Sequence, residues 1–424
     1  MSDLNVWLER TFHLSERKTN VGQEFRAATA TFLTMSYILL VNPQLLSKVG
    51  IPATAIVVST ALASFVGSFI AGYFGNLPLG LSPGIGLSAY LTYGLILGEG
   101  LTVQEAFTSC FISGVLLFIL SVTGLSSIVM KLIPRSVKLA TIVGMGLQIA
   151  LVGMTSVKLV VPNEQTIVGL GDIHSPQIWL SIIGLVLIGS LLFHQVRGGI
   201  LIGIFAMTLI DWMMRGHVPT QFMQLPDLNI NMTEFIGFEG FSIARCMTGI
   251  LAFLFIGVID VSGVIFGMAS LADLTEPDGT IPGATPTFIA VALSTIVSAA
   301  TGGTPVIVYV ESAAGIKEGG RTGLTAVIIS AYFLLSLFFA PVLSEIPLIA
   351  TSPVAILVGA MMMSQSVEID WNNMSEAIPA FLTLVTMPFT FSITNGIVLG
   401  LITALMFYVT TGQIFEDAKV MLYG

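Results

Sequence analysis

Residues 251–269 read LAFLFIGVIDVSGVIFGMA, an apolar run with a single charged residue, Asp260, near its centre. A second acid, Glu311, stands in another apolar stretch, TPVIVYVESAAG at residues 304–315. About 20 apolar residues are enough for a helix to cross a bilayer. A charged carboxylate at the centre of the bilayer costs roughly 2.5–3.5 kcal/mol on insertion scales. A chain that carries this cost twice is expected to use both acids, so Asp260 and Glu311 are the first candidates for a functional site.

The composition is that of an integral membrane protein. Of the 424 residues, 54% are hydrophobic and 9% are charged, whereas soluble domains have about 25% charged residues. The net charge of −9, without a basic patch, argues against a nucleic-acid partner. The isolated Cys110 and Cys246 have neither metal-ligand spacing nor a disulfide framework, and no P-loop is present. We therefore expect no metal, no cofactor and no catalytic residues.

Twelve apolar segments have the length expected of membrane-spanning helices. They cover roughly residues 25–46, 52–74, 103–124, 137–157, 177–194, 198–214, 243–271, 284–301, 322–343, 351–364, 376–393 and 395–411. Two further apolar segments, 81–97 and 304–316, are short and begin with Ser-Pro or Thr-Pro, and counting them gives fourteen crossings. The amino-terminal 20 residues lack the apolar core of a signal peptide, so the first span is expected to stay uncleaved.

Both termini are expected to be cytoplasmic. Basic residues in short loops mark the cytoplasmic side of a membrane protein. With fourteen crossings, one side receives the basic residues of the amino-terminal segment and of several loops. These loop and tail residues are Lys131, Arg135, Lys138, Arg197, Lys317, Arg321 and Lys419.

The two short segments lie about half a chain length apart, in matching positions of two halves of seven spans each. An odd number of spans per half requires the halves to be inverted relative to one another. Short, interrupted segments in matching positions of inverted repeats indicate a transporter site in mid-membrane. Chance similarity between glycine-rich membrane helices is the alternative. A half-helix exposes unpaired N–H groups at its start, and with two acids these favour a flat, neutral, hydrogen-bonding solute over an anion.

Four motifs resemble the nucleobase–ascorbate transporter family, also called nucleobase:cation symporter family 2, and within it the AzgA-like branch of adenine, guanine and hypoxanthine permeases. They are FLTMSYILLVNPQ (32–44), LGLSPGIGLSAYLTYG (79–94), IDVSGVIFGMA (259–269) and YVESAAGIKEGGRTGLTAV (309–327). The resemblance implies an all-α, 14-span, 7+7 inverted repeat, with short strands before the half-helices of spans 3 and 10. The implied segments are a cytoplasmic amino-terminal segment (1–24), core domain spans 1–4 (25–130), gate domain spans 5–7 (131–241), core spans 8–11 (242–343), gate spans 12–14 (344–412) and a cytoplasmic tail (413–424).

The resemblance further implies uptake of purine nucleobases across the cell membrane, coupled to protons, by an elevator-type movement of the core past the gate. Homodimers occur among such proteins. Asp260 and Glu311 match the acids of spans 8 and 10 that hold substrate and protons. Ser88 and Ser312 are candidate substrate contacts, with hydrogen bonds to their own backbone as the alternative. Tyr309 is expected either to border the base or to pack as a core aromatic residue.

Several positions depart from the pattern of this branch. Gly257 stands where an aspartate is usual, Val261 and Val264 where threonines are usual, and Ser88 where an asparagine is usual. These losses of polar groups leave open an uncoupled nucleobase facilitator or binder, or a transporter of another solute such as uracil, xanthine or an anion.

Three further polar residues are interpreted without a substrate. Tyr37 is interpreted as packing, and Gln148 and Gln365 as contacts between helices.

Overall fold

The computed structural model describes residues 3–125, 133–163, 165–196, 198–216, 219, 221–226, 232–276 and 280–411. Eight helices within these ranges are long and apolar enough to cross a membrane, and two shorter apolar helical segments accompany them. The chain is therefore an integral, multi-pass membrane protein. Lys131, Arg197 and Lys419, which entered the prediction of orientation, lie outside the described residues.

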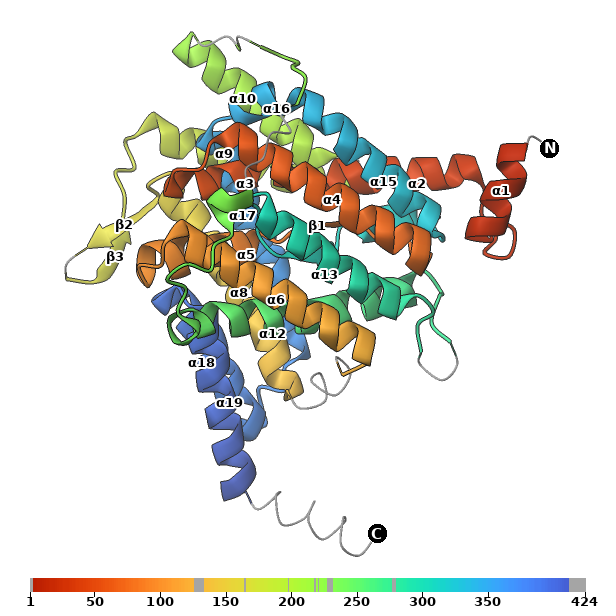
Figure 1. The fold of residues 1–424 in the computed structure, drawn as a ribbon. Helices are drawn as coiled ribbons and strands as arrows, with labels where there is room; N and C mark the ends of the chain where they lie inside the picture. The colour runs from red at the N-terminus through yellow and green to blue at the C-terminus, as the bar shows by residue number, and fades with distance from the viewer. Residues whose placement is uncertain are drawn as a thin grey trace, which may run out of the picture.

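The elements are mostly helical and follow the predicted spans closely (Figure 1). The first part of the chain contains α1 (Asp3–Phe12), α2 (Val21–Met35), α3 (Ile38–Leu46), α4 (Ala53–Gly75), β1 (Leu81–Pro83), α5 (Ile85–Ala89), the π-helical segment η2 (Tyr90–Gly98), α6 (Val103–Thr123), α8 (Arg135–Ser156), β2 (Val160–Asn163), β3 (Ile167–Leu170), α9 (Pro176–Phe193) and α10 (Gly199–Arg215). The second part contains α11 (Met232–Phe235), α12 (Ile243–Leu271), α13 (Ala284–Ala300), β4 (Val306–Val308), α14 (Ser312–Lys317), α15 (Gly323–Ser336), α16 (Ala340–Ser344), α17 (Leu348–Met362), α18 (Met374–Thr390) and α19 (Ile393–Thr410). Three short 3-10 turns, η1 (Ser47–Val49), η3 (Leu337–Phe339) and η4 (Met363–Glu368), extend α3, α15 and α17.

Small residues allow the long helices to approach one another closely. A Cβ atom added to Gly72 of α4 would lie 2.5 Å from the carbonyl oxygen of Gly323, where α15 begins. A Cβ atom on Gly146 of α8 would lie 2.9 Å from the carbonyl oxygen of Gly359 in α17. Membrane helices associate through such small-residue contacts because lipid provides little hydrophobic driving force between them.

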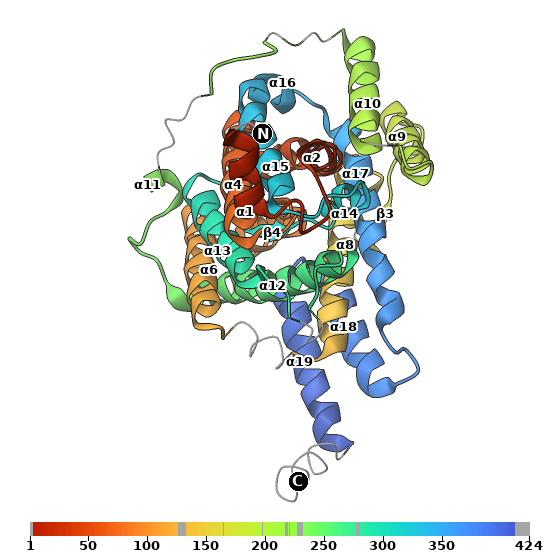
Figure 2. The same cartoon turned by 90° about the vertical axis from the view of Figure 1, so that its right-hand side faces the viewer.

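The two short segments predicted from the sequence are each a strand followed by a helix. β1 pairs with β4 in an antiparallel ribbon whose register places Leu81 opposite Val308 and Pro83 opposite Val306. β1 is entirely buried, and it lies among the helices in Figure 1, as β4 does in Figure 2. The ribbon confirms the short strands implied before the third and tenth spans. It also satisfies backbone groups that the bilayer could not satisfy.

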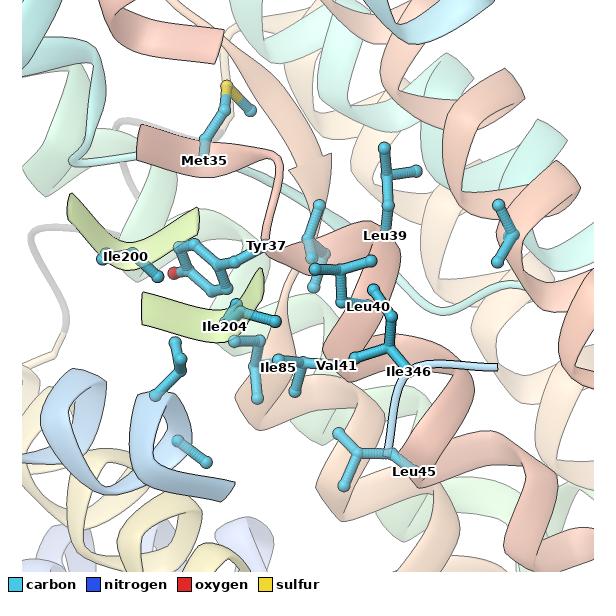
Figure 3. Packing of buried hydrophobic residues seen from close by; sticks show 14 of the residues in the cluster. Met35, Tyr37, Leu39, Leu40, Val41, Leu45, Ile85, Ile200, Ile204 and Ile346 are labelled. Atoms are coloured by element: carbon cyan, nitrogen blue, oxygen red, sulfur yellow. The ribbon is translucent and has the colours of Figure 1, made fainter. Parts of the chain in front are cut away.

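The predicted span at 25–46 is interrupted. Its first part is α2 and its second part is α3, and Ser36 and Tyr37 separate the two helices. Figure 3 shows Tyr37 beside this turn, with its ring close to Ile200 and Ile204 of α10. The interruption turns the side chain of Tyr37 away from a regular helical path and toward the centre of the molecule.

Candidate functional site

A cavity of about 2110 Å³ lies between the two interrupted segments and the neighbouring helices. Its wall is formed by parts of α2, α5, α8, α12, α14 and α17. Asp260 and Glu311 both line it, so the structure brings together the two acids that stand out in the sequence. At one end the lining includes Arg135 and Glu368, whose side chains form a 3.0 Å ion pair and are 73% and 54% exposed. The cavity therefore opens to solvent at that end.

Glu311 lies in the turn between β4 and α14. Its carboxylate accepts a hydrogen bond from the phenol of Tyr37, with 2.6 Å between Oη and Oε1. The hydroxyl of Thr34 is 3.5 Å from the Glu311 carbonyl oxygen. Because Tyr37 binds Oε1, the second carboxylate oxygen, Oε2, is the acceptor that remains for a bound solute.

Asp260 lies in the middle of α12 and is 7% exposed. Its Oδ2 atom is buried and has no hydrogen-bond partner among the described residues. Buried polar atoms in proteins are almost always paired, and an unpaired one costs about 1–3 kcal/mol. A ligand that donates a hydrogen bond to this unpaired carboxyl oxygen on the cavity wall, or a proton that binds it, would remove that cost.

Tyr309 follows β4 and lines the cavity. Its phenol donates a 2.6 Å hydrogen bond to the carbonyl oxygen of Pro83 at the end of β1, so it ties the two interrupted segments together. Its ring centre is 6.5 Å from that of Tyr37. Tyr309 thus has a structural hydrogen bond and also presents a ring at the cavity wall.

The two candidate serines are fully buried and lie behind the cavity wall. The hydroxyl of Ser88 donates to the carbonyl oxygen of Gly84 at 3.0 Å and lies 2.7 Å from Oγ1 of Thr304. The hydroxyl of Ser312 accepts a 3.0 Å hydrogen bond from the backbone N–H of Gly80. Both hydroxyls hold the backbone of the interrupted segments, and contact with a substrate stays a prediction for each.

The positions that depart from the family pattern are not all on the cavity. Val264 lines it, whereas a Cβ atom on Gly257 would meet Leu117 of α6 at 3.3 Å. Val261 is fully buried in a hydrophobic cluster with residues of α4, α6 and α13. Two of the three substitutions in α12 therefore alter helix packing, while the polar groups of the cavity itself include both acids.

The structure adds to the interpretation of Tyr37 and Gln148 that the sequence suggested. Tyr37 packs, but it also binds Glu311, which the packing interpretation missed. The sequence held no signal for this bond, because the same span carries several other hydroxyl groups. Gln148 is buried within the bundle, and its amide oxygen and nitrogen have no hydrogen-bond partner among the described residues, so a polar contact between helices stays a prediction. Gln365 lines the cavity.

In the described part of the chain, no three His, Cys, Asp or Glu side chains gather to hold a metal ion.

Apolar membrane helices around an open cavity, with two interrupted segments and two acids at its wall, define a membrane transport protein. A family model described as "Permease family", that of the xanthine/uracil permeases, matches residues 22–399. The chain belongs to this family, the nucleobase–ascorbate transporter family whose motifs its sequence resembles.

The similarity to individual proteins extends over nearly the whole chain. The guanine/hypoxanthine permease PbuO of Bacillus subtilis is 36% identical and aligns over 92% of each chain. The adenine permease AdeP of Escherichia coli is 32% identical over 96% of this chain and 92% of its own length. Among solved structures, the transmembrane domain of the cyanobacterial bicarbonate transporter BicA has a TM-score of 0.66, with 16% identity over 90% of this chain and 96% of that one. The likeness to BicA concerns the fold alone.

Proposed function

We propose that this protein is a secondary active transporter of purine nucleobases (adenine, guanine or hypoxanthine) that couples their uptake to protons. The observation that carries the proposal is the cavity that contains both Asp260 and Glu311. The proposal is supported by relatives named as guanine/hypoxanthine and adenine permeases, which match over more than nine-tenths of the chain.

The chemistry of the cavity suits a purine. A purine base is flat and neutral, and it offers ring N–H groups as donors and ring nitrogens as acceptors. Oε2 of Glu311 and Oδ2 of Asp260 are available acceptors for its N–H groups. The backbone N–H groups at the start of α5 have no partner within that helix, and residues 85–87 line the cavity, so they would serve as donors. The ring of Tyr309 would border the base.

Proton coupling would follow from the isolation of Asp260. Burial away from water disfavours the charged form of a carboxyl group, and Oδ2 has no hydrogen-bond partner in the described part of the chain that would stabilise a charge there. Each proton bound by Asp260 or Glu311 would remove one negative charge from the site while the bound base is neutral, which lowers the cost of moving the site through the bilayer.

We place this chemistry in an elevator-type cycle of a 14-span, 7+7 inverted repeat in the cell membrane. The core would comprise residues 25–130 and 242–343, and the gate residues 131–241 and 344–412. Both termini would be cytoplasmic, with the transporter working as a homodimer. The two strand–helix segments that meet in the β1–β4 ribbon support this arrangement.

The test is uptake of radiolabelled adenine, guanine and hypoxanthine by cells that lack purine permeases of their own. The double variant Asp260→Asn with Glu311→Gln is expected to lose uptake by about 100-fold or more. The matched control is Asp211→Asn, which changes an acid of α10 that is buried, paired with Arg215 at 2.9 Å and absent from the cavity lining. Uptake is compared at equal amounts of the wild-type protein, the double variant and the control variant in the membrane. Unchanged purine uptake in the double variant would contradict the proposal.

An uncoupled nucleobase facilitator is the second candidate, because the cavity carries Val264 where the related permeases usually carry a hydroxyl group. The same assay separates the two by adding a protonophore and by varying the external pH. Uptake against a concentration gradient that collapses with the protonophore supports symport. Uptake that reaches equilibrium and ignores both treatments supports the facilitator.

A further inference from the structure

The side chain of Tyr37 makes two kinds of contact. Its ring packs against apolar side chains, and its hydroxyl binds Glu311. Its ring is 2% exposed and belongs to a hydrophobic cluster with Ile200 and Ile204 of α10 (Figure 3). Its hydroxyl donates a hydrogen bond to Oε1 of Glu311. The tightly packed ring limits the positions available to the hydroxyl, so the hydrogen bond is made from a fixed point.

Tyr37 is also the last of three evenly spaced contacts between α2 and the α14 segment. The hydroxyl of Thr31 accepts a 3.1 Å hydrogen bond from the N–H of Gly315. Thr34 contacts the carbonyl oxygen of Glu311, and Tyr37 binds its carboxylate. Residues three apart lie on the same face of a helix, and the interruption after Met35 lets Tyr37 continue this row beyond the end of α2. The backbone and the side chain of Glu311 are therefore held by the same element.

We propose that Tyr37 is a positioning residue that sets which oxygen of Glu311 meets a bound solute. The phenol occupies Oε1 and leaves Oε2 to accept an N–H group of the solute, in a direction fixed by the packing of the Tyr37 ring. This inference rests on the proposed function, in which a nucleobase binds at Glu311. It gives the turn between α2 and α3 a role in recognition that packing does not account for.

A hydrogen bond donated to an ionised carboxylate is stronger than one between neutral groups, and it stabilises the ionised form. Loss of the phenol would remove this hydrogen bond and would let the carboxyl group rotate. The titratable groups that face Glu311 are Tyr37 from the α2–α3 turn, Asp260 from α12 and Tyr309 from the end of β4. A variant of Tyr37 must therefore keep Asp260 and Tyr309, so that any change in pH dependence can be assigned to the lost phenol.

The decisive variant is Tyr37→Phe, which keeps the packed ring and removes the hydroxyl. It is expected to raise KM for the transported purine about tenfold, with a smaller change in kcat, and to move the pH of half-maximal uptake upward. The matched control is Tyr332→Phe. The phenol of Tyr332, in α15, lies 2.8 Å from the hydroxyl of Thr29 in α2, and neither residue lines the cavity. The control is expected to keep both KM and the pH profile.

A double-mutant cycle with Glu311→Gln completes the experiment. If Tyr37 acts through Glu311, Tyr37→Phe adds little to the effect of Glu311→Gln, so the two effects are not additive. An unchanged KM and pH profile in Tyr37→Phe, while Glu311→Gln lowers uptake to a small residual rate, would overturn the positioning role and leave the proposed function standing. Unchanged uptake in Glu311→Gln would overturn both. An unfolding temperature of Tyr37→Phe far below that of Tyr332→Phe would assign Tyr37 to the fold alone and also overturn the role.

Discussion

The two interrupted segments share the β1–β4 ribbon but are held by different neighbours. The first segment, β1–α5–η2, faces α8 through Gly86 and reaches Thr394 of α19 through the phenol of Tyr90. The second segment, β4–α14, lies against α2, which contacts both Gly315 and Glu311. The two glycines at the start of the half-helices differ most. A Cβ atom on Gly315 would meet the backbone of α2, whereas a Cβ atom on Gly86 would meet only side chains of α8. Further along the first segment, Gly94 also lies close to backbone, at the carbonyl oxygen of Phe391.

The largest effect is expected from Gly315→Ala. The added Cβ would lie 2.5 Å from the carbonyl oxygen of Ala27 and would also overlap the hydroxyl of Thr31. Backbone cannot move away as a flexible side chain can, so we expect a loss of about 3 kcal/mol in the free energy of unfolding. Thermal unfolding and gel filtration of the detergent-purified protein measure it. A variant with wild-type stability would show that the contact between α2 and α14 is not tight.

Ser312→Ala is expected to have the next largest effect. It removes the acceptor of the Gly80 N–H, which is buried beside the ribbon, and an unsatisfied buried donor costs about 1–3 kcal/mol. The unfolding temperature is the measurement, with Ser312→Thr as the control that keeps a hydroxyl. Equal stability of the alanine and threonine variants would contradict a structural role for the hydroxyl.

The positions of the two interrupted segments and the identity of both acids could be predicted from the sequence. The interrupted segments at 81–97 and 304–316 were marked by Ser-Pro and Thr-Pro pairs, and the isolation of Asp260 and Glu311 in apolar surroundings singled out both acids. Such signals are local. A charge or a proline in an apolar run changes the energy of that run wherever it packs in the fold.

The rest depends on contacts between distant parts of the chain. The partner of Glu311 is 274 positions away, and the turn that presents Tyr37 contains neither glycine nor proline. The hydroxyls of Ser88 and Ser312 could equally have faced a solute, and their use by neighbouring groups is fixed by how the two segments dock. No local pattern encodes these choices.

Tyr90→Phe is expected to have a smaller effect, about 1 kcal/mol. It removes the 3.0 Å hydrogen bond to Oγ1 of Thr394, whereas the ring contact with Phe253 and the hydrogen bond from Thr394 to the carbonyl oxygen of Thr248 persist. The unfolding temperature of Tyr90→Phe, compared with that of the double variant Tyr90→Phe with Thr394→Val, measures it. A loss as large as that of Ser312→Ala would show that the Tyr90 hydrogen bond contributes as much to stability as the bond between Gly80 and Ser312.

The smallest effect is expected from Gly86→Ala, which pairs with Gly315→Ala. The nearest atom to the added Cβ is Cδ1 of Ile149 at 3.4 Å, the end of a side chain that can adjust. Alanine also favours a helix over glycine by roughly 0.5–1 kcal/mol, which offsets the closer contact. We expect an unfolding temperature within about two degrees of the wild type. A drop comparable to that of Gly315→Ala would remove the distinction between the two segments.

The β1–β4 ribbon also constrains how the chain is made. β1 enters the membrane long before β4 exists, since Pro83 and its ribbon partner Val306 stand in different halves of the chain. A strand in lipid needs a partner for its backbone groups, and β1 has its own only after the second half of the chain has been inserted. The first half must therefore be sheltered by other protein or by water during synthesis. Pairing over so long a loop is slow in general, because the entropy of loop closure is lost before the contact is gained.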